Sequence, residues 1–309
     1  MTTPQLTDRA NLAARTARET VQASGRGRDY TAGSMIFLGA LWFSLFFGVM
    51  VLVLLLVTTA IDGAGRFDGA LLTNYFSRVR PDETGFRAGI LGSMWLMLGT
   101  ATLAVPIGIA SALYLEEFAD RHRWYNRLIE LNLQNLAAVP SVVYGLLAVA
   151  TMSLLGFRQT GIVLGGAIAL ALLILPVIII TTREAIRAVP SEIRFGSLAL
   201  GATVWQTTWR QTLPAAVPGI ATGTILGLSR AIGEAAPLLL LGVAIGVRFD
   251  PNGFLSAFTA LPMQIYNMTS QPQAEFQTAA AAAIIVLLVM ILGMNAVAIV
   301  IRNKFQKTW

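Results

Sequence analysis

Six long apolar stretches divide this chain and limit it to one class of fold. A helix needs about 20 apolar residues to cross a bilayer core of ~30 Å, and in lipid every backbone polar group must be paired within the protein. The sequence therefore predicts an all-α membrane protein with six transmembrane helices. The fifth stretch is too long for one straight span, so we expect it to bend or to continue beyond the bilayer. The stretches are Met35–Ala60, Gly89–Leu113, Leu131–Leu155, Ile162–Ile180, Val217–Val247 and Thr278–Ile301.

The composition agrees with this fold class. Of the 309 residues, 55% are hydrophobic and 12% are charged, with a mean hydropathy of +0.68. Soluble domains carry about 25% charged residues. We expect three regions: a polar N-terminal tail at 1–34, a six-helix membrane domain at 35–301 that includes a polar loop at 181–216, and a short basic tail at 302–309. The N-terminal tail is expected either to form an amphipathic helix or to stay mobile.

The positions of Lys and Arg predict the orientation. With a cytoplasmic N-terminus, the inside segments hold 15 of the 22 basic residues and the outside loops hold 6, with Arg230 inside a span. Cytoplasmic loops of membrane proteins are enriched in Lys and Arg. We therefore expect a multi-pass protein of the plasma (inner) membrane with both termini in the cytoplasm. Topology explains the net charge of +6, and nothing in the sequence interleaves basic with stacking aromatic residues as nucleic-acid partners require.

Several absences narrow the function. The chain has no cysteine and one histidine, His122, which we interpret as a solvated loop residue; neither gives a metal-binding cluster. The lysines are Lys304 and Lys307, at the C-terminal end. The phosphate-binding loop G-x-x-x-x-G-K-[ST] is therefore missing, and the chain is not expected to hydrolyse ATP by that chemistry. We predict a protein that is not an enzyme and that holds no metal or cofactor itself.

The polar loop at 181–216 has the features of a docking element. Pro190 is expected to stop one helix and Ser191 to N-cap the next. Gly201 stands where a helix ends in a left-handed residue. Thr203 and Gln206 form a T-x-x-Q capping box that starts a second short helix. Two short helices that meet at a glycine predict a surface that another protein grips.

The second short helix carries a stripe of large apolar residues. Trp205, Trp209 and Leu213 follow one another at four-residue spacing, and Pro214 is expected to end the helix. The tryptophans either dock a partner or anchor the helix among lipid headgroups, as interfacial aromatics do. The predicted loop residues are Ser191, Gly201, Ala202, Trp205, Trp209, Leu213 and Pro214.

The fifth span carries a stripe of small residues at every fourth position. Such a stripe predicts that another helix approaches closely. It is formed by Gly219, Gly223, Gly227, Ala231 and Ala235.

The same span contains two opposite charges. Arg230 and Glu234 are four residues apart, which on a helix places them about 6 Å apart. A charged group within a span is costly and marks either a structural ion pair or a functional pathway. As a pathway, Arg230 would meet an anion in transit, and Glu234 would accept a hydrogen bond from an anion that still carries a proton, such as hydrogenphosphate. Pro237 is expected to kink the helix.

The loop resembles the cytoplasmic loop of ABC-importer permeases, whose consensus is E-A-A-x3-G-x9-I-x-L-P. Gly201 and the pair Leu213-Pro214 match it. Phe195-Gly196-Ser197 stand in place of Glu-Ala-Ala, and Gln211 replaces Ile. The resemblance implies a type I permease fold with a coupling helix, but not the ion pair that the consensus Glu would make with an ATPase.

Four other segments resemble phosphate-importer permeases, most closely the A type (PstA), and the resemblance covers about Gly89 to Ile301. It implies four kinds of partner: a related permease (PstC type), two cytoplasmic ATPase subunits (PstB type) that bind ATP and Mg, an extracytoplasmic phosphate-binding protein (PstS type), and membrane lipid. The small-residue stripe would then lie near the second permease. The segments are Leu115–Ala119, Val139–Gly145, Ser229–Pro237 and Leu261–Tyr266.

The resemblance also directs attention to three further places. Pro140, with Ser141 and Tyr144, breaks the third span beside the pathway or produces an ordinary kink. Glu116 and Glu117 are interpreted as solvated loop residues rather than substrate contacts. The outer segment Phe254–Met268 is apolar and aromatic, and we expect it to lie on the membrane surface and to help receive the binding protein.

Rival functions remain at this point. Within the same class, the substrate can be molybdate, sulfate or phosphonate, although the S-R-A-I-G-E-A-A-P segment favours phosphate. A free-standing secondary anion transporter would use Arg230 and Glu234 as a proton-coupled site, but it would have no use for the loop at 181–216, and inverted halves are not evident. A membrane enzyme acting on lipid or phosphate esters would need a cluster of His, Asp or Lys, which the sequence lacks.

Overall fold

Helices dominate the part of the chain that the structure describes. The computed structural model describes residues 32–120 and 123–305. Within these ranges five helices are long and apolar enough to cross a membrane, and six crossings result if one bent helix pair counts as a span. The long helices are α2 (Ala32–Gly63), α4 (Arg87–Leu113), α7 (Val163–Arg187), α10 (Leu213–Ile232) and α13 (Ala274–Phe305).

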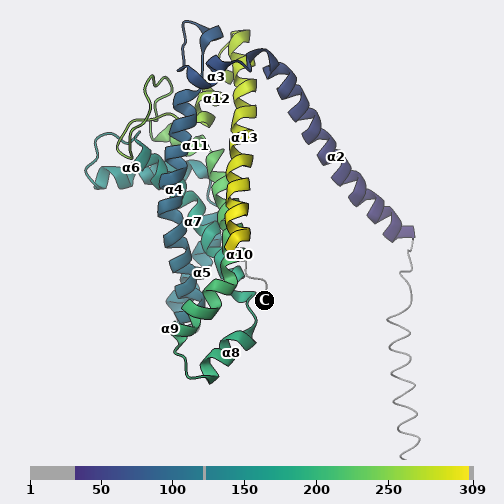
Figure 1. Ribbon diagram of the computed structural model, residues 1–309, viewed down its shortest axis with the longest axis vertical. Helices are drawn as coiled ribbons and strands as arrows, with labels where there is room; N and C mark the ends of the chain where they lie inside the picture. Colours follow the sequence, from purple (N-terminus) through teal and green to yellow (C-terminus); the bar gives the residue numbers. More distant parts are fainter. Residues whose placement is uncertain (1–31, 121–122, 306–309) are drawn as a thin grey trace, which may run out of the picture. The chain divides into compact units, whose positions relative to one another are not determined.

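Shorter elements connect the long helices. In Figure 1, α4, α7, α10 and α13 run side by side, with α8 and α9 at one end and α3 and α12 at the other. The short helices are α3 (Gly69–Thr73), α5 (Trp124–Ala137), α6 (Ser141–Leu154), α8 (Ser191–Ala199), α9 (Val204–Thr207), α11 (Ala236–Leu240) and α12 (Leu261–Thr269). Single turns of 3₁₀-helix are η1 (Ala64–Arg66) and η2 (Pro81–Glu83), and single turns of π-helix are η3 (Tyr114–Phe118) and η4 (Thr208–Thr212).

The chain divides into two compact units, 1–58 and 59–309. The described part of the first unit is the beginning of α2, whose apolar side chains are exposed, as expected of a helix with a lipid or protein neighbour. The last turn of α2 belongs to the second unit, where Gly63 packs on the backbone of α13: an added Cβ would lie 2.7 Å from the Ala282 nitrogen. The expected N-terminal tail lies almost wholly outside the described residues.

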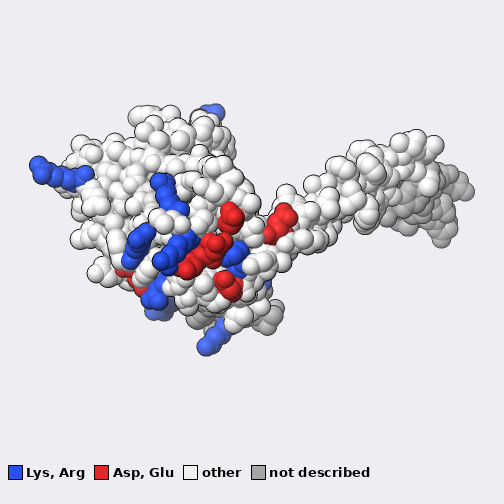
Figure 2. Space-filling model, turned by 90° about the horizontal axis from the view of Figure 1, so that it is seen from above, with Lys and Arg blue, Asp and Glu red and all other residues white. Residues whose placement is uncertain are grey.

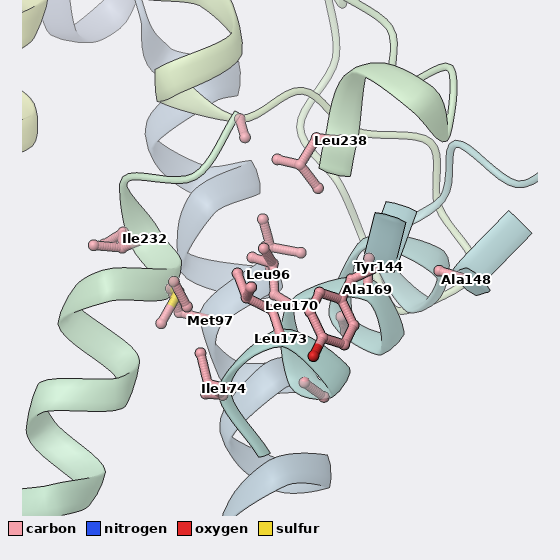
Figure 3. Packing of buried hydrophobic residues seen from close by; sticks show 14 of the residues in the cluster. Leu96, Met97, Tyr144, Ala148, Ala169, Leu170, Leu173, Ile174, Ile232 and Leu238 are labelled. Atoms are coloured by element: carbon pink, nitrogen blue, oxygen red, sulfur yellow. The ribbon is translucent and has the colours of Figure 1, made fainter. Parts of the chain in front are cut away.

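The core of the second unit forms around α7. Leu170, Ile174 and Ile178 follow one another at four-residue spacing on α7 and are all fully buried. Figure 3 shows Leu170 and Ile174 among side chains of α4, α6 and α10, including Leu96 and Tyr144. A helix that is apolar on nearly every face is suited to the centre of such a bundle.

The small-residue stripe of α10 packs against α7 of the same chain. An added Cβ on Gly219 would lie 2.6 Å from Ala185 Cβ, and one on Gly223 would overlap Thr181. Gly227 faces Ile178, and Ala231 is buried. The predicted close approach is confirmed. The stripe itself is occupied by α7, and the expectation that it lies near a second permease stays a prediction.

Both irregular spans break at residues that the sequence singled out. α5 and α6 meet at an angle of 113° around Pro140, so the third stretch is a bent pair rather than a straight span. The fifth stretch ends as a helix at Ile232 and resumes as α11. Pro237 lies in the first turn of α11, so the break precedes it and falls at Gly233–Ala235, and Ala235 is not on α10. The predicted kink at Pro237 is therefore displaced by a few residues.

Most of the outer segment Phe254–Met268 is packed inside the protein, and Phe254, Leu255 and Tyr266 keep exposed side chains. Phe258, Leu261 and Met268 are fully buried. Phe254 makes an edge-to-face contact with Trp95 of α4, with ring centroids 5.4 Å apart, and Ser93 Oγ of α4 accepts a hydrogen bond from the Leu261 nitrogen at 2.9 Å. The prediction that this segment lies on the membrane surface is wrong, because its apolar side chains pack on α4 and α13.

Charged residues gather at the end of the molecule that carries α3 and α12, where acidic and basic side chains alternate (Figure 2). Arg87 Nη2 lies 2.6 Å from Asp250 Oδ2 and fastens the loop after α11 to the start of α4. This hydrogen-bonded guanidinium holds the pKa of the Asp250 carboxyl below its usual value. The ion pair between Arg87 and Asp250 is therefore fully formed at a pH above the usual pKa of an Asp. It is lost as the pH falls through the lowered pKa of Asp250, where the carboxylate becomes protonated.

The fit between α10 and α7 gives a testable prediction. Gly223→Val should destabilise the protein by about 1–3 kcal/mol, because the added methyl groups overlap Thr181. Gly293→Val on α13 is the matched control, since a Cβ there meets no described atom within 4 Å. Thermal unfolding in detergent would measure both variants. Equal midpoints for the two variants would contradict the packing described here.

Candidate functional site

The loop between α7 and α10 has most of the local geometry expected from its sequence. Gly201 has φ +86°, the left-handed conformation that favours glycine. Thr203 Oγ1 accepts from the Gln206 nitrogen at 3.2 Å, and Gln206 Oε1 accepts from the Thr203 nitrogen at 3.0 Å, which completes the capping box. The expected N-cap at Ser191 is wrong: Pro190 occupies the cap position, and Ser191 is the first residue of α8.

The chain does not leave the helix at Pro214. After α9 it passes through the π-turn η4 and enters α10, where Pro214 lies in the first turn. A proline is tolerated in a first turn, and the wider π-turn before it spares the ring a clash with the preceding carbonyls. The predicted helix end at Pro214 is therefore wrong, and the loop is continuous with the membrane helix.

The outer face of this loop is apolar and exposed. Phe195 of α8 is 68% exposed and Leu200 is 91% exposed. Trp205 and Trp209 remain neighbours, with ring centroids 5.4 Å apart, although Trp209 lies on the π-turn η4 and Trp205 on α9. Trp205 also contacts Phe118 at 5.9 Å. An exposed apolar patch at the end of a bundle is typical of an interaction surface.

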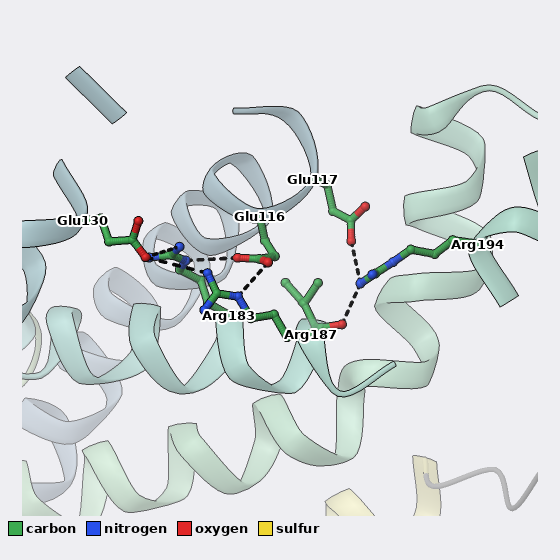
Figure 4. A network of polar contacts seen from close by, with 7 residues as sticks. Glu116, Glu117, Glu130, Arg183, Arg187 and Arg194 are labelled. Carbon is green, nitrogen blue, oxygen red and sulfur yellow. Dashed lines mark hydrogen bonds and ion pairs between the residues drawn. The ribbon is translucent and has the colours of Figure 1, made fainter. Parts of the chain in front are cut away.

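Beneath this loop lies a network of charged side chains that the sequence analysis missed (Figure 4). Glu116, on η3, is only 3% exposed in its side chain, and it pairs with Arg183 at 3.3 Å and Arg187 at 2.8 Å, both on the last turns of α7. Glu130 of α5 also pairs with Arg183, at 2.9 Å. Buried charges are retained when they are paired in this way.

The neighbouring carboxylate reaches the loop itself. Glu117 Oε1 lies 3.0 Å from Arg194 Nη2 of α8, and the same guanidinium donates to the Ile186 carbonyl oxygen at 2.7 Å. The prediction that Glu116 and Glu117 are solvated loop residues is therefore wrong. A signal was available in the sequence: Arg183 and Arg187 are four residues apart on a helix and require acidic partners nearby.

Arg230 and Glu234 form the ion pair expected from their spacing, with Nε and Oε1 3.7 Å apart. The pair does not follow one helical face, because α10 ends at Ile232 and Glu234 lies beyond the helix end. The two side chains are 46% and 23% exposed. Arg230 thus keeps part of its guanidinium open for another ligand.

The third-span residues lie on α6, which packs against α11. Ser141 begins α6, and Tyr144 is one turn further, buried, with its hydroxyl donating to the Leu136 carbonyl oxygen at 2.6 Å. An added Cβ on Gly145 would lie 2.7 Å from the Pro237 oxygen, so α6 closely approaches the segment that follows Glu234. Tyr144 belongs to the same buried apolar cluster as Ala231 and Ile232, which follow Arg230 in the chain. The structure therefore brings Tyr144 close to the end of α10 that carries Arg230.

Two polar contacts join α10 to α13 and were not foreseen. Ser229 Oγ lies 2.6 Å from Asn295 Oδ1, and Arg302 Nη1 donates to Thr222 Oγ1 at 3.2 Å. Asn295 gave no sequence signal because it stands alone in an apolar stretch. In the ranges that the structure describes, no group of three or more His, Cys, Asp or Glu side chains is arranged to hold a metal ion; His122 lies outside them.

Comparison with known proteins identifies the family. Residues 104–306 match the model of the binding-protein-dependent transport system inner membrane component. The chain belongs to this family. The phosphate transport system permease protein PstA of Mycobacterium leprae is 34% identical over 234 residues, 74% of each chain. PstA of Yersinia pestis is 31% identical over 264 residues, 84% of this chain and 87% of its own.

Solved structures share the fold of this permease. A chain of a bacterial ABC transporter involved in the import of the acidic polysaccharide alginate superposes with a TM-score of 0.61 at 18% identity, covering 89% of this chain and 98% of that one. A chain of the MetNI methionine ABC transporter in an inward-facing conformation gives 0.56 at 16% identity, covering 72% and 95%. The predicted fold class, an all-α ABC-importer permease, is confirmed.

Proposed function

We propose that this permease is the membrane-spanning subunit of an ATP-driven importer that moves inorganic phosphate across the plasma membrane. The observation that carries the proposal is the similarity to PstA permeases over most of the chain, at 31% and 34% identity. The exposed loop Ser191–Pro214 supports the coupling to an ATPase. The chain itself is a transport subunit, and ATP hydrolysis belongs to a partner.

The proposed partners are those that the resemblance to phosphate-importer permeases implies. Two ATPase subunits of the PstB type would bind ATP and Mg. Phe195, Leu200 and Trp205 expose an apolar face to receive one of them. A related PstC-type permease would complete the pathway, and a PstS-type binding protein would deliver phosphate. The loop that contains α8 and both chain termini would then face the cytoplasm, in line with the excess of basic residues in these segments.

Arg230 and Glu234 are proposed to line the pathway. Their 3.7 Å separation is too long for a direct hydrogen bond, so the guanidinium N–H groups remain available to a passing anion. Glu234 weakens the hold on the anion by like charge and, as an acceptor, suits an anion that still carries a proton. Ser141 and Tyr144 would form the wall of the pathway where α6 meets α11.

The direct test is ATP hydrolysis by the complex that co-purifies with this chain, measured in lipid nanodiscs with its binding protein. We expect phosphate to stimulate hydrolysis, and sulfate and molybdate to leave it at the basal rate. Stimulation by another oxyanion would support the proposed importer architecture and contradict phosphate as its substrate. Failure of any ATPase to co-purify would favour the secondary-transporter alternative.

The pathway proposal is tested by Arg230→Gln. Losing a charge-assisted hydrogen bond worth about 2 kcal/mol should lower phosphate uptake at sub-saturating concentration by about thirtyfold. Arg158→Gln, in an exposed loop, is the control and should leave uptake unchanged. Uptake would be measured in proteoliposomes after equal assembly is verified. Unchanged uptake by Arg230→Gln would restrict the pair to a structural role.

A further inference from the structure

The helix α8 is attached to the rest of this permease by few contacts, and one of them is ionic. None of its nine residues, all of them described, is buried. Ile193 packs against the apolar cluster of Leu113 and Ile186. Ser197 Oγ lies 2.9 Å from Thr207 Oγ1. Arg194 adds an ion pair with Glu117 at 3.0 Å and a hydrogen bond to the Ile186 carbonyl oxygen at 2.7 Å.

Glu117 connects α8, the first helix of the loop, to the end of a membrane helix. It lies on η3, which directly continues α4. Its neighbour Glu116 binds Arg183 and Arg187 at the end of α7. Two consecutive carboxylates on one π-turn therefore bind two different elements, α8 and α7, and both elements are tied to the end of α4.

The pair that joins α8 to the end of α4 is largely buried. Glu117 is 11% exposed and Arg194 is 25% exposed in their side chains. Across the whole network three glutamates face three arginines, so it is neutral when intact. Separating a buried pair leaves an uncompensated charge away from water, which is costly. Glu117 and Arg194 are therefore expected to move together when either one is displaced.

The two π-turns lie on either side of α9, one in contact with it and one continuous with it. η3 carries Glu116 and Glu117, and η4 precedes α10. Phe118, the last residue of η3, contacts Trp205 just before η4. Single π-turns often mark functional sites in helices. The ends of α4 and α10 therefore both have a non-standard turn beside the loop that α8 begins.

We propose that Glu117 and Arg194 form a positioning pair that transmits a displacement of α8 to the end of α4, and that Glu116 carries the same displacement to α7. This inference rests on the proposed function, since the displacement would come from the ATPase seated on α8. Without this ion pair the ATPase would stay bound, but its ATP hydrolysis would no longer be coupled to the movement of the spans.

The test uses the purified complex of permeases, ATPase subunits and binding protein in proteoliposomes. Three variants remove the pair: Glu117→Gln, Arg194→Met and both together. Arg194→Lys keeps the charge with a shorter reach. Glu184→Gln and Arg127→Gln are matched controls, since both residues are exposed on α7 and α5, outside the docking loop. The measured quantities are the amount of phosphate moved per ATP hydrolysed and the factor by which binding protein stimulates hydrolysis.

We expect Glu117→Gln and Arg194→Met each to lower the phosphate moved per ATP by about tenfold, within the range typical of coupling between sites. The double variant should be no worse than either single one, because both remove the same link. Arg194→Lys, which keeps the charge but reaches less far, should give a ratio between that of Arg194→Met and that of the wild type, and the controls should match the wild type. A purely structural role would lower the yield of complex and leave this ratio unchanged.

Wild-type ratios in both neutral variants, or additive losses in the double variant, would overturn the inference. If the neutral variants do not assemble, Arg194→Lys decides: a lowered ratio supports the pair, and a wild-type ratio overturns it. The outcome is separable from the proposed function, because a wild-type complex without phosphate-stimulated hydrolysis would contradict that proposal before any variant is compared.

Discussion

The close approach of α4 and α10 to α7 is the contact on which the other features of this permease depend. An added Cβ on Gly99 or Gly108 of α4 would lie 2.8 Å from Ala167 Cβ or 2.6 Å from Ile178 Cγ2 of α7. In lipid, helices gain little from hydrophobic burial and associate through such close packing of small residues. With α7 held between its neighbours on both sides, the ends of three spans have fixed positions.

That arrangement places the charged ends of α7 under the loop that leaves it. Arg183 and Arg187 lie on the last turns of α7 and meet Glu116 because α4 ends beside them. The first helix of the loop, α8, then contacts the rest of the protein through the apolar side chain of Ile193 and the ion pair of Arg194. Packing of the spans thus decides the position of α8, and the proposed partner on α8 would act on the spans through those contacts.

Features set by neighbouring residues could be predicted from the sequence, and features set by distant ones could not. The left-handed Gly201, the capping box at Thr203 and the break at Pro140 each depend on a few adjacent residues, and all are found. Burial of Glu116 depends on α7 and α5, so spacing alone gave a solvated loop. Hydropathy also cannot distinguish a segment against lipid from one inside the protein, which is why Phe254–Met268 was misplaced.

The loop from Ser191 to Pro214 is proposed to dock an ATPase and takes its shape from Gly201. The most direct measurement compares the ATPase that co-purifies with the wild type, Gly201→Asn and Gly201→Val. Asparagine tolerates the left-handed backbone and valine does not, while a Cβ at this position meets no described atom within 4 Å. We predict that wild type and Gly201→Asn retain the ATPase and that Gly201→Val loses it while its thermal unfolding stays close to that of wild type. Full retention by Gly201→Val, or no ATPase with the wild type, would contradict the account.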